Sequence, residues 1–377
     1  MPRVIVLACV ALLAFAASAG AATNAAKRLD RALDRLVAMP RGPMGAIAIV
    51  QRGSARTVHR AGVSDRNRRN PIRSTDHMRM ASTSKAFSGA VALALVDQGM
   101  LSLDDTIGQR LPTLPAAWAP VTLRQLLDHT SGLPDFTKST TYLDTLRRDT
   151  RTVFLPHELL LSYVADQPPL FPPGTQFNYS NSDNIVVALM AEQATGRPYD
   201  ALLASLVSEP LGLNETSLPD GFHLPAPYLH GYDNLGARPQ DLSIVASASA
   251  VWASGGVVSS PLDANAFARG YVGRKLFGQA TQAEQLRLVK GHSEPTGPGA
   301  NLAGLGIFRY RTRCGTVYGH TGNFPGYTQF LAATLDGTRS VTFSISEQLN
   351  EEMTGRLLKV FNALRRAEGT AVCAAFD

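Results

Sequence analysis

The sequence has few cysteines, no metal-binding motif and, beyond its first twenty residues, no long apolar run. Three of its 377 residues are cysteines, and its eight histidines are dispersed. Because neither a His-Glu-x-x-His motif nor a Cys/His cluster with zinc spacing occurs, we expect no metal and no other cofactor. No later segment is apolar over the roughly 20 residues that a spanning helix needs, so no stable membrane anchor is expected.

Charge of either sign is also modest, at 18% of residues, with a net charge of +6. The one dense basic run, from Arg66 to Arg73, contains Asn and Pro but no aromatic residue. A solvated loop explains this run better than a nucleic-acid interface, so no nucleic-acid partner is expected. The hydrophobic content of 45% is ordinary for a globular protein that is long enough for two domains or one large one.

The N-terminus is typical of a secretory signal. Arg3 precedes an apolar stretch from Val4 to Ala16, and Ala17-Ser18-Ala19 fits a small-residue cleavage site. We therefore interpret residues 1–21 as a signal peptide and expect a secreted or periplasmic protein. Val6-Leu7-Ala8-Cys9 loosely resembles a lipoprotein box, but the apolar stretch before it is very short.

Removal of the signal leaves two cysteines, Cys314 and Cys373. An even number in an exported protein predicts one disulfide, which would tie the C-terminal tail to a predicted strand. Two inert buried thiols are the alternative.

Strand patterns lie near both ends of the chain and helix patterns fill its middle. This order predicts an α+β fold, in which an antiparallel sheet is flanked by N- and C-terminal helices and carries an inserted helical domain. We expect a discontinuous mixed domain of residues 22–80 and 245–377, a helical domain of residues 81–244, and an active site between them. The expected strands are Gly45 to Val50, Ala55 to Ala61, Trp252 to Ser259, Ile307 to Arg313, Val317 to His320, Tyr327 to Thr334 and Ser340 to Ser346. The expected helices are Asn24 to Met39, Ser84 to Gln98, Val121 to His129, His157 to Ala165, Asn184 to Gln193, Tyr199 to Val207, Leu262 to Arg269 and Glu351 to Arg366.

The stretch from Met80 to Phe87 contains Ser82 and Lys85, three residues apart. If a helix begins here, the two side chains lie on one face and can touch. A serine hydroxyl needs a base to become a nucleophile, and a lysine amine can serve if burial or a nearby positive charge lowers its pKa. Ser and Lys are common, however, so a pair with this spacing also arises by chance.

Two other segments offer partners for this pair. Tyr179 and Asn181 lie two positions apart in an expected loop; Tyr179, made more acidic by a lysine, could carry protons, and Asn181 could hold Lys85 and a substrate carbonyl. A plain turn is the alternative, because Asn and Ser are turn formers. His320, Thr321, Gly322 and Asn323 stand at a strand end, where the glycine lets backbone approach an extended substrate. A hairpin turn with a surface histidine is the alternative there.

Taken together, Ser82-x-x-Lys85, Tyr179-x-Asn181 and His320-Thr321-Gly322 resemble the three signature elements of penicillin-recognising serine enzymes. The Tyr-x-Asn element is similar to that of the branch with class C β-lactamases, secreted D-alanyl-D-alanine carboxypeptidases of the Streptomyces type, D-aminopeptidases and related esterases. Further segments that resemble this branch are Asp104-Asp105, Gln125 to Pro134, Phe171 to Gly174, Ser254 to Ser260 and Tyr318 to Gly322.

This resemblance implies a β-lactamase/transpeptidase-like fold and an acyl-enzyme hydrolase. The resemblance implies that Lys85 and Tyr179 deprotonate Ser82 and that Asn181 binds substrate. It also implies that the amides of Ser82 and Asn323 stabilise the oxyanion, with Thr321 and Gly322 beside them. His320, in place of the lysine usual in class C β-lactamases, resembles the carboxypeptidases. So does the late pair Cys314 and Cys373, which is bridged in those enzymes.

Three further residues are assigned by the resemblance. Trp252 and Phe136 would line the substrate pocket, with core packing as the alternative. Arg309 would clamp a substrate carboxylate, which an arginine fork can pair in two places. Arg309, Arg311 and Arg313 share one face of their strand, however. That face of the strand points either into the active site or into solvent.

The function implied is D-alanyl-D-alanine carboxypeptidase activity on a peptidoglycan stem-peptide-like or small acyl substrate, with β-lactams as covalent ligands. A class C-like β-lactamase, an esterase or a D-aminopeptidase of the same fold is the alternative. A non-catalytic cell-envelope binding module is an alternative of another class.

Overall fold

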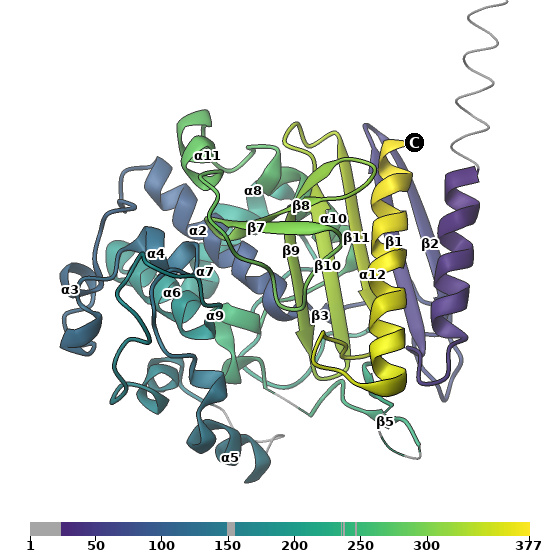
Figure 1. Cartoon of the computed structure of the whole chain (residues 1–377), viewed down its shortest axis with the longest axis horizontal. Helices are drawn as coiled ribbons and strands as arrows, with labels where there is room; N and C mark the ends of the chain where they lie inside the picture. The colour runs from purple at the N-terminus through teal and green to yellow at the C-terminus, as the bar shows by residue number, and fades with distance from the viewer. Residues whose placement is uncertain (1–23, 149–154, 235, 237, 246) are drawn as a thin grey trace, which may run out of the picture.

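The computed structural model describes residues 24–148, 155–234, 236, 238–245 and 247–377. The expected signal peptide, residues 1–21, and Cys9 lie outside the described residues. Figure 1 shows a central sheet with the helical middle of the chain on one side and two terminal helices against the other face. The mixed α/β class expected from the sequence is confirmed. The domain boundaries at residues 81 and 245 stay a prediction.

The central sheet has seven strands in the order β2-β1-β11-β10-β9-β8-β7, and each neighbouring pair is antiparallel. Its strands are β1 (Gly45–Arg52), β2 (Ala55–Gly62), β7 (Ala300–Gly304), β8 (Ile307–Arg311), β9 (Thr316–Phe324), β10 (Tyr327–Ala333) and β11 (Arg339–Ile345). The pairing of β1 with β11, in which Ala46 faces Ile345, joins the two ends of the chain. Residues 45–62 and 300–345 therefore form one sheet.

Two helices pack on one face of this sheet, one of residues 24–37 and the other α12 (Gly355–Phe376). Apolar residues at helical spacing, such as Leu29, Leu33 and Leu36, are buried there with Phe330 and Phe343 of the sheet. The disulfide joins Cys314, in the β8–β9 turn, to Cys373 of α12, with 5.1 Å between their Cα atoms. The predicted pairing is thus present, although Cys373 lies in a helix.

The other face of the sheet carries α2 (Ser84–Asp97) and α10 (Pro261–Val272). The remaining helices gather beyond α2, away from the two terminal helices (Figure 1). They are α3 (Ile107–Arg110), α4 (Leu123–Leu127), α5 (Thr140–Arg148), α6 (Asn181–Thr195), α7 (Tyr199–Leu203), α8 (Glu209–Leu211), α9 (Trp252–Gly255) and α11 (Gln279–Gln285). The 3₁₀-helices are η1 (Ala81–Thr83), η2 (Ala116–Trp118), η3 (Phe136–Lys138), η4 (His157–Tyr163) and η6 (Ala248–Ala250), and η5 (Ala204–Ser208) is a π-helix. Two small ribbons pair β3 (Met78–Arg79) with β6 (Val258–Ser259) and β4 (Tyr232–Asp233) with β5 (Gln240–Asp241).

None of the described helices is both long and apolar enough to cross a bilayer.

One expected strand is wrong. Residues 252–255 form the helical turn α9, and only Val258–Ser259 is a strand. A short apolar run satisfies either periodicity, and packing of α9 against α2 and α6 decides for the helix.

Three expected boundaries also shift. Strand β9 continues through the His-Thr-Gly motif to Phe324, α6 begins at Asn181, and α12 ends at Phe376. The edge strand β7 was not expected from the sequence, because its residues Ala300–Gly304 carry no β-branched side chain.

Candidate active site

The expected nucleophile lies in the tight turn η1 at the start of α2. Ala81, just before Ser82, has a φ of +52°, a conformation that non-glycine residues rarely adopt and that often occurs at functional sites. Strand β9 passes directly beside this turn. A Cβ atom on Gly322 would lie 2.7 Å from the Ser82 amide nitrogen and 2.8 Å from that of Thr83. Gly322 therefore permits a contact that brings the β9 backbone to the nucleophile.

Lys85 is buried and its amine meets three oxygen atoms. The distance from Nζ is 3.2 Å to Ser82 Oγ, 2.7 Å to Asn181 Oδ1 and 2.7 Å to the Ser254 carbonyl. The turn η1 and the first turn of α2, which follows it, place Ser82 and Lys85 side by side, as the three-residue spacing predicts. Ser254 was missed as a partner because a backbone carbonyl leaves no mark in the sequence.

Burial lowers the pKa of Lys85 to about 7, although the charges of Asp135, Glu294 and Asp183 raise it in part. A neutral amine has two N–H donors and one lone pair. It can therefore donate to Asn181 and to the Ser254 carbonyl while its lone pair faces the Ser82 hydroxyl. This arrangement suits Lys85 to accept the proton of Ser82 near neutral pH.

Asn181 is held in place by two residues that the sequence analysis missed. Its Nδ2 atom donates to the carboxylate of Asp135, at 3.0 Å from Oδ2, and to Thr137 Oγ1 at 3.0 Å. With its nitrogen engaged, Asn181 must turn its oxygen toward Lys85. Asp135 also accepts from the Thr137 amide, and that turn-forming role is all that its sequence position suggested.

Tyr179 lies against both Lys85 and Ser82. The Lys85 amine is 4.9 Å from the centre of the Tyr179 ring. Burial raises the pKa of Tyr179 well above its usual value, and the facing Ser82 hydroxyl lowers it only in part. The expectation that a nearby lysine makes this phenol more acidic is therefore wrong, because desolvation outweighs that effect. Tyr179 stays protonated at neutral pH and is suited to donate a proton.

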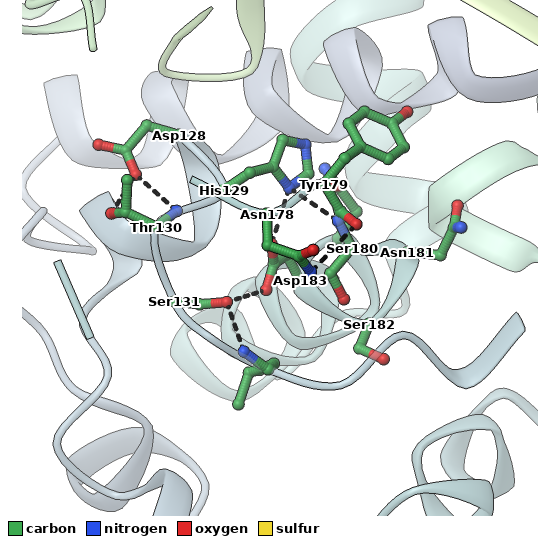
Figure 2. Close-up of polar contacts among 12 residues, drawn as sticks. Asp128, His129, Thr130, Ser131, Asn178, Tyr179, Ser180, Asn181, Ser182 and Asp183 are labelled. Atoms are coloured by element: carbon green, nitrogen blue, oxygen red, sulfur yellow. Dashed lines mark hydrogen bonds and ion pairs between the residues drawn. The ribbon is translucent and has the colours of Figure 1, made fainter. Parts of the chain in front are cut away.

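A buried polar cluster stands behind Tyr179 (Figure 2). The ring of His129 lies 4.5 Å from that of Tyr179. His129 Nδ1 is 2.7 Å from Asp183 Oδ2, and the Ser131 hydroxyl donates to Asp183 Oδ1 at 2.5 Å. Burial lowers the pKa of His129 and raises that of Asp183. Burial therefore disfavours charge on both members of this pair.

The sequence marked His129 and Ser131 only through the resemblance of the segment from Gln125 to Pro134. Asp183 carried no signal, because its position in α6 relative to His129 depends on helix packing.

His320 and Thr321 face away from the open cleft. His320 is 1% exposed, and its Nδ1 donates to the Thr321 carbonyl. Burial lowers the pKa of His320 to about 3, so the ring is uncharged at neutral pH. Its ring centre is 6.3 Å from that of Tyr179, so the uncharged ring lies beside Tyr179 and offers no charge to a substrate carboxylate. The Thr321 hydroxyl donates to the Pro295 carbonyl and so anchors a neighbouring loop.

A cleft of about 400 Å³ opens above Ser82. Its polar lining consists of Ser82, Thr137, Tyr179, Asn181, Glu294, Asn323 and Gln348, and its apolar lining includes Tyr142, Leu143, Leu146, Val245, Val251 and Phe324. The expected site residues Ser82, Tyr179, Asn181 and Asn323 thus meet in one cleft. Lys85 lies just beneath its floor.

Three residues expected at this cleft lie elsewhere. Trp252 stacks on His157 with ring centres 3.9 Å apart, and Phe136 is buried against Tyr142 with centres 5.1 Å apart. Both side chains are buried in the apolar core of the helical region. Arg309 lines a separate hollow on the sheet with Arg311 and other residues, since strand alternation turns it away from Phe308 and Tyr310. It does not provide a carboxylate clamp for this cleft.

No group of three or more His, Cys, Asp or Glu side chains is placed to hold a metal within the part of the chain that the structure describes.

Curated proteins similar to this chain are mainly hydrolases. A D-aminopeptidase of Cereibacter sphaeroides is 31% identical over 220 residues, which make up 57% of this chain and 41% of the relative. Penicillin-binding protein 4* of Bacillus subtilis is 23% identical over 334 residues, or 84% of this chain and 70% of the relative. The chain thus matches only about two fifths of the length of the D-aminopeptidase.

Solved structures resemble the whole fold. A D-stereospecific amidohydrolase from Streptomyces sp. aligns with a TM-score of 0.74 and 27% identity, over 85% of this chain and 94% of that one. A D-amino acid amidase from Ochrobactrum anthropi SV3 aligns with a TM-score of 0.80 and 23% identity, over 92% and 97%. The family model described as Beta-lactamase matches residues 29–363. With that match over most of its length, the chain belongs to the beta-lactamase family of serine hydrolases.

Proposed function

We propose that the protein cleaves an amide, peptide or ester bond through an acyl intermediate on Ser82. The observation that carries this proposal is the contact of a buried Lys85, whose pKa is about 7, with the Ser82 hydroxyl. Lys85 takes the hydroxyl proton while Ser82 Oγ bonds to the substrate carbonyl carbon. The negative charge that develops on the carbonyl oxygen lies near the amides of Ser82 and Asn323, and each such donor contributes roughly 3 kcal/mol.

The leaving group departs when its bond to the carbonyl carbon breaks and it receives a proton. Tyr179 supplies that proton, since burial keeps its phenol protonated, and the proton held by Lys85 restores the phenol. Water then attacks the acyl group with the same residues as proton carriers, which releases the acid and free Ser82. Deacylation resembles the reverse of acylation with water in place of the leaving group, so the same groups are suited to both half-reactions.

Two substrate classes are candidates within this chemistry. The sequence resemblance favours a D-alanyl-D-alanine carboxypeptidase, which must hold a free C-terminal carboxylate. The cleft lining contains no arginine or lysine among the described residues, and His320 is uncharged. This observation favours the second candidate, an aminopeptidase or amidase of D-amino acids, as the names of the relatives suggest. For either class we propose β-lactams as covalent ligands and a secreted or periplasmic location.

A single preparation tests the proposal. We expect Ser82→Ala to lose nearly all hydrolysis of p-nitrophenyl acetate and all labelling by a fluorescent penicillin. Comparing kcat/KM for diacetyl-Lys-D-Ala-D-Ala, D-alanine p-nitroanilide and nitrocefin on the wild type separates peptidase, amidase and β-lactamase activities. Turnover that persists in Ser82→Ala would exclude the acyl-serine mechanism.

A further inference from the structure

One charged side chain faces the cleft. Among the described residues that line it, Glu294 alone carries a formal charge. It lies in the segment between α11 and β7, far in sequence from the three motifs. Its negative charge repels a substrate carboxylate, which needs a positively charged group in the cleft.

The Glu294 carboxylate has no protein partner. Within the described part of the chain its oxygens make no hydrogen bond and no ion pair, and Lys138 and His292 act on it only through longer-range electrostatics. Its side chain is partly buried, and burial raises its pKa. A partly desolvated carboxylate without a partner is costly for the free protein. A cationic ligand would offset that cost.

The loop that carries Glu294 is held firmly at several points. The Thr321 hydroxyl donates to the Pro295 carbonyl, and Arg365 of α12 donates to the Gly297 carbonyl at 2.7 Å. The Thr296 amide donates to the carboxylate of Glu351. A carboxylate on a fixed loop loses little freedom when it binds a ligand, which favours binding.

Glu294 is also close enough to influence the reacting groups. Its charge is among the causes that raise the pKa values of Lys85 and Tyr179. The cleft therefore places this carboxylate and the nucleophile Ser82 around one substrate.

We propose that Glu294 binds the free ammonium group of an aminoacyl substrate while Ser82 attacks that substrate's carbonyl carbon. This inference rests on the proposed acyl-Ser82 mechanism and specifies the chemistry of its substrate. A substrate that carries a primary amine beside the scissile bond is favoured, and an N-acylated or C-terminally anionic one is not.

The test compares Glu294→Gln with the wild type on three substrates. They are alanine p-nitroanilide in both D and L forms, its N-acetyl derivative, and neutral p-nitrophenyl acetate. Glu352→Gln is the matched control, because Glu352 is exposed, lies outside the cleft lining and changes the net charge equally. Thermal unfolding of each variant verifies that it is folded.

We expect Glu294→Gln to lower kcat/KM for the free-amine anilide roughly 10- to 100-fold, with Glu352→Gln unchanged. Ester hydrolysis should stay within about twofold of the wild type in both variants. The wild type should prefer the free amine to its N-acetyl derivative, and Glu294→Gln should lose that preference.

Equal turnover of the free-amine and N-acetyl anilides by the wild type would overturn the inference. So would an unchanged kcat/KM for the free-amine anilide in Glu294→Gln. Ester hydrolysis that still depends on Ser82 would then leave the acyl-serine mechanism intact. If the wild type shows no hydrolysis that depends on Ser82, both the acyl-serine mechanism and the inference about Glu294 are overturned.

Discussion

The two walls of the Ser82 cleft differ in how their polar groups are satisfied. On the helical wall, formed by η1, α2 and the start of α6, Lys85 and Asn181 are paired with neighbouring groups, although the buried Tyr179 hydroxyl beside them has no hydrogen-bond partner among the described residues. On the loop wall, formed by residues 293–297 and the end of β9, the Glu294 carboxylate lines the cleft and makes no hydrogen bond or ion pair with the described residues. In the proposed mechanism, the helical wall performs the proton transfers and the loop wall selects the substrate.

The titratable groups of the helical wall also favour their uncharged forms. Burial lowers the pKa of Lys85 toward neutrality and raises those of Tyr179 and Asp183. Uncharged groups exchange protons without a large solvation penalty, which suits general acid and base catalysis. Variants of the two walls should therefore affect different kinetic quantities.

The largest effect is expected from Lys85→Met, which keeps an unbranched side chain but removes the amine. The acylation rate of Ser82 should fall by roughly 10³- to 10⁴-fold, because Lys85 is the base that contacts its hydroxyl and no other described residue replaces it. Stopped-flow labelling with a fluorescent penicillin measures this rate. Acylation near the wild-type rate would show that another group takes the proton.

Gly322→Ala should have the next largest effect. Its added Cβ would lie 2.7 Å from the Ser82 amide nitrogen, so η1 or β9 must shift and the oxyanion donors separate. We expect kcat to fall by roughly 10²- to 10³-fold, as when one oxyanion donor is lost. Gly221→Ala is the control, because nothing lies within 4 Å of its added Cβ. If Gly322→Ala is as active as Gly221→Ala, the backbone of β9 does not approach η1 this closely.

Tyr179→Phe removes the hydroxyl and keeps the ring against His129. We expect both acylation and deacylation to slow by roughly 10²-fold, since a positioned proton carrier contributes at least that much. Single-turnover kinetics with an ester separate the two steps. A variant with wild-type rates for both steps would exclude Tyr179 as the proton carrier.

The pH dependence should reveal the state of Lys85. Its pKa is lowered to about 7 and its neutral form is the base, so kcat/KM should rise with pH and level off above this value. Below about 7 the rate should fall roughly tenfold per pH unit. Hydrolysis of neutral p-nitrophenyl acetate gives the profile without substrate titration. A flat profile between pH 5 and 8, or a fall with rising pH, would contradict a neutral lysine base.

The smallest effect is expected from Asp183→Asn. An asparagine can accept from Ser131 and donate to His129, as a protonated Asp183 does. We expect kcat within about threefold of the wild type and a free energy of unfolding lower by under about 1.5 kcal/mol. Asp183→Ala should cost more, about 3 kcal/mol, because Ser131 then lacks its acceptor. Denaturant unfolding measures both, and an equal loss in the two variants would mean that Asp183 is ionised.

Much of the fold could be predicted from periodicity. The strands Gly45–Arg52 and Ala55–Gly62 and the helix of residues 24–37 were expected within a few residues, since each pattern is long and its ends carry turn residues. Trp252–Gly255 was mistaken for a strand because a four-residue segment has no distinct period. Its packing against α2 and α6 determines its conformation.

The sequence by itself determined the nucleophile pair, because one helical turn suffices to bring Ser82 and Lys85 together. Its motif order also indicated the family and the roles of Tyr179 and Asn181. The tertiary structure alone decided which way side chains face and what desolvates them. It turns Arg309 and Trp252 away from the cleft, leaves His320 uncharged, and places Glu294 in the lining of the cleft. These properties depend on contacts between segments distant in sequence, which local patterns do not specify.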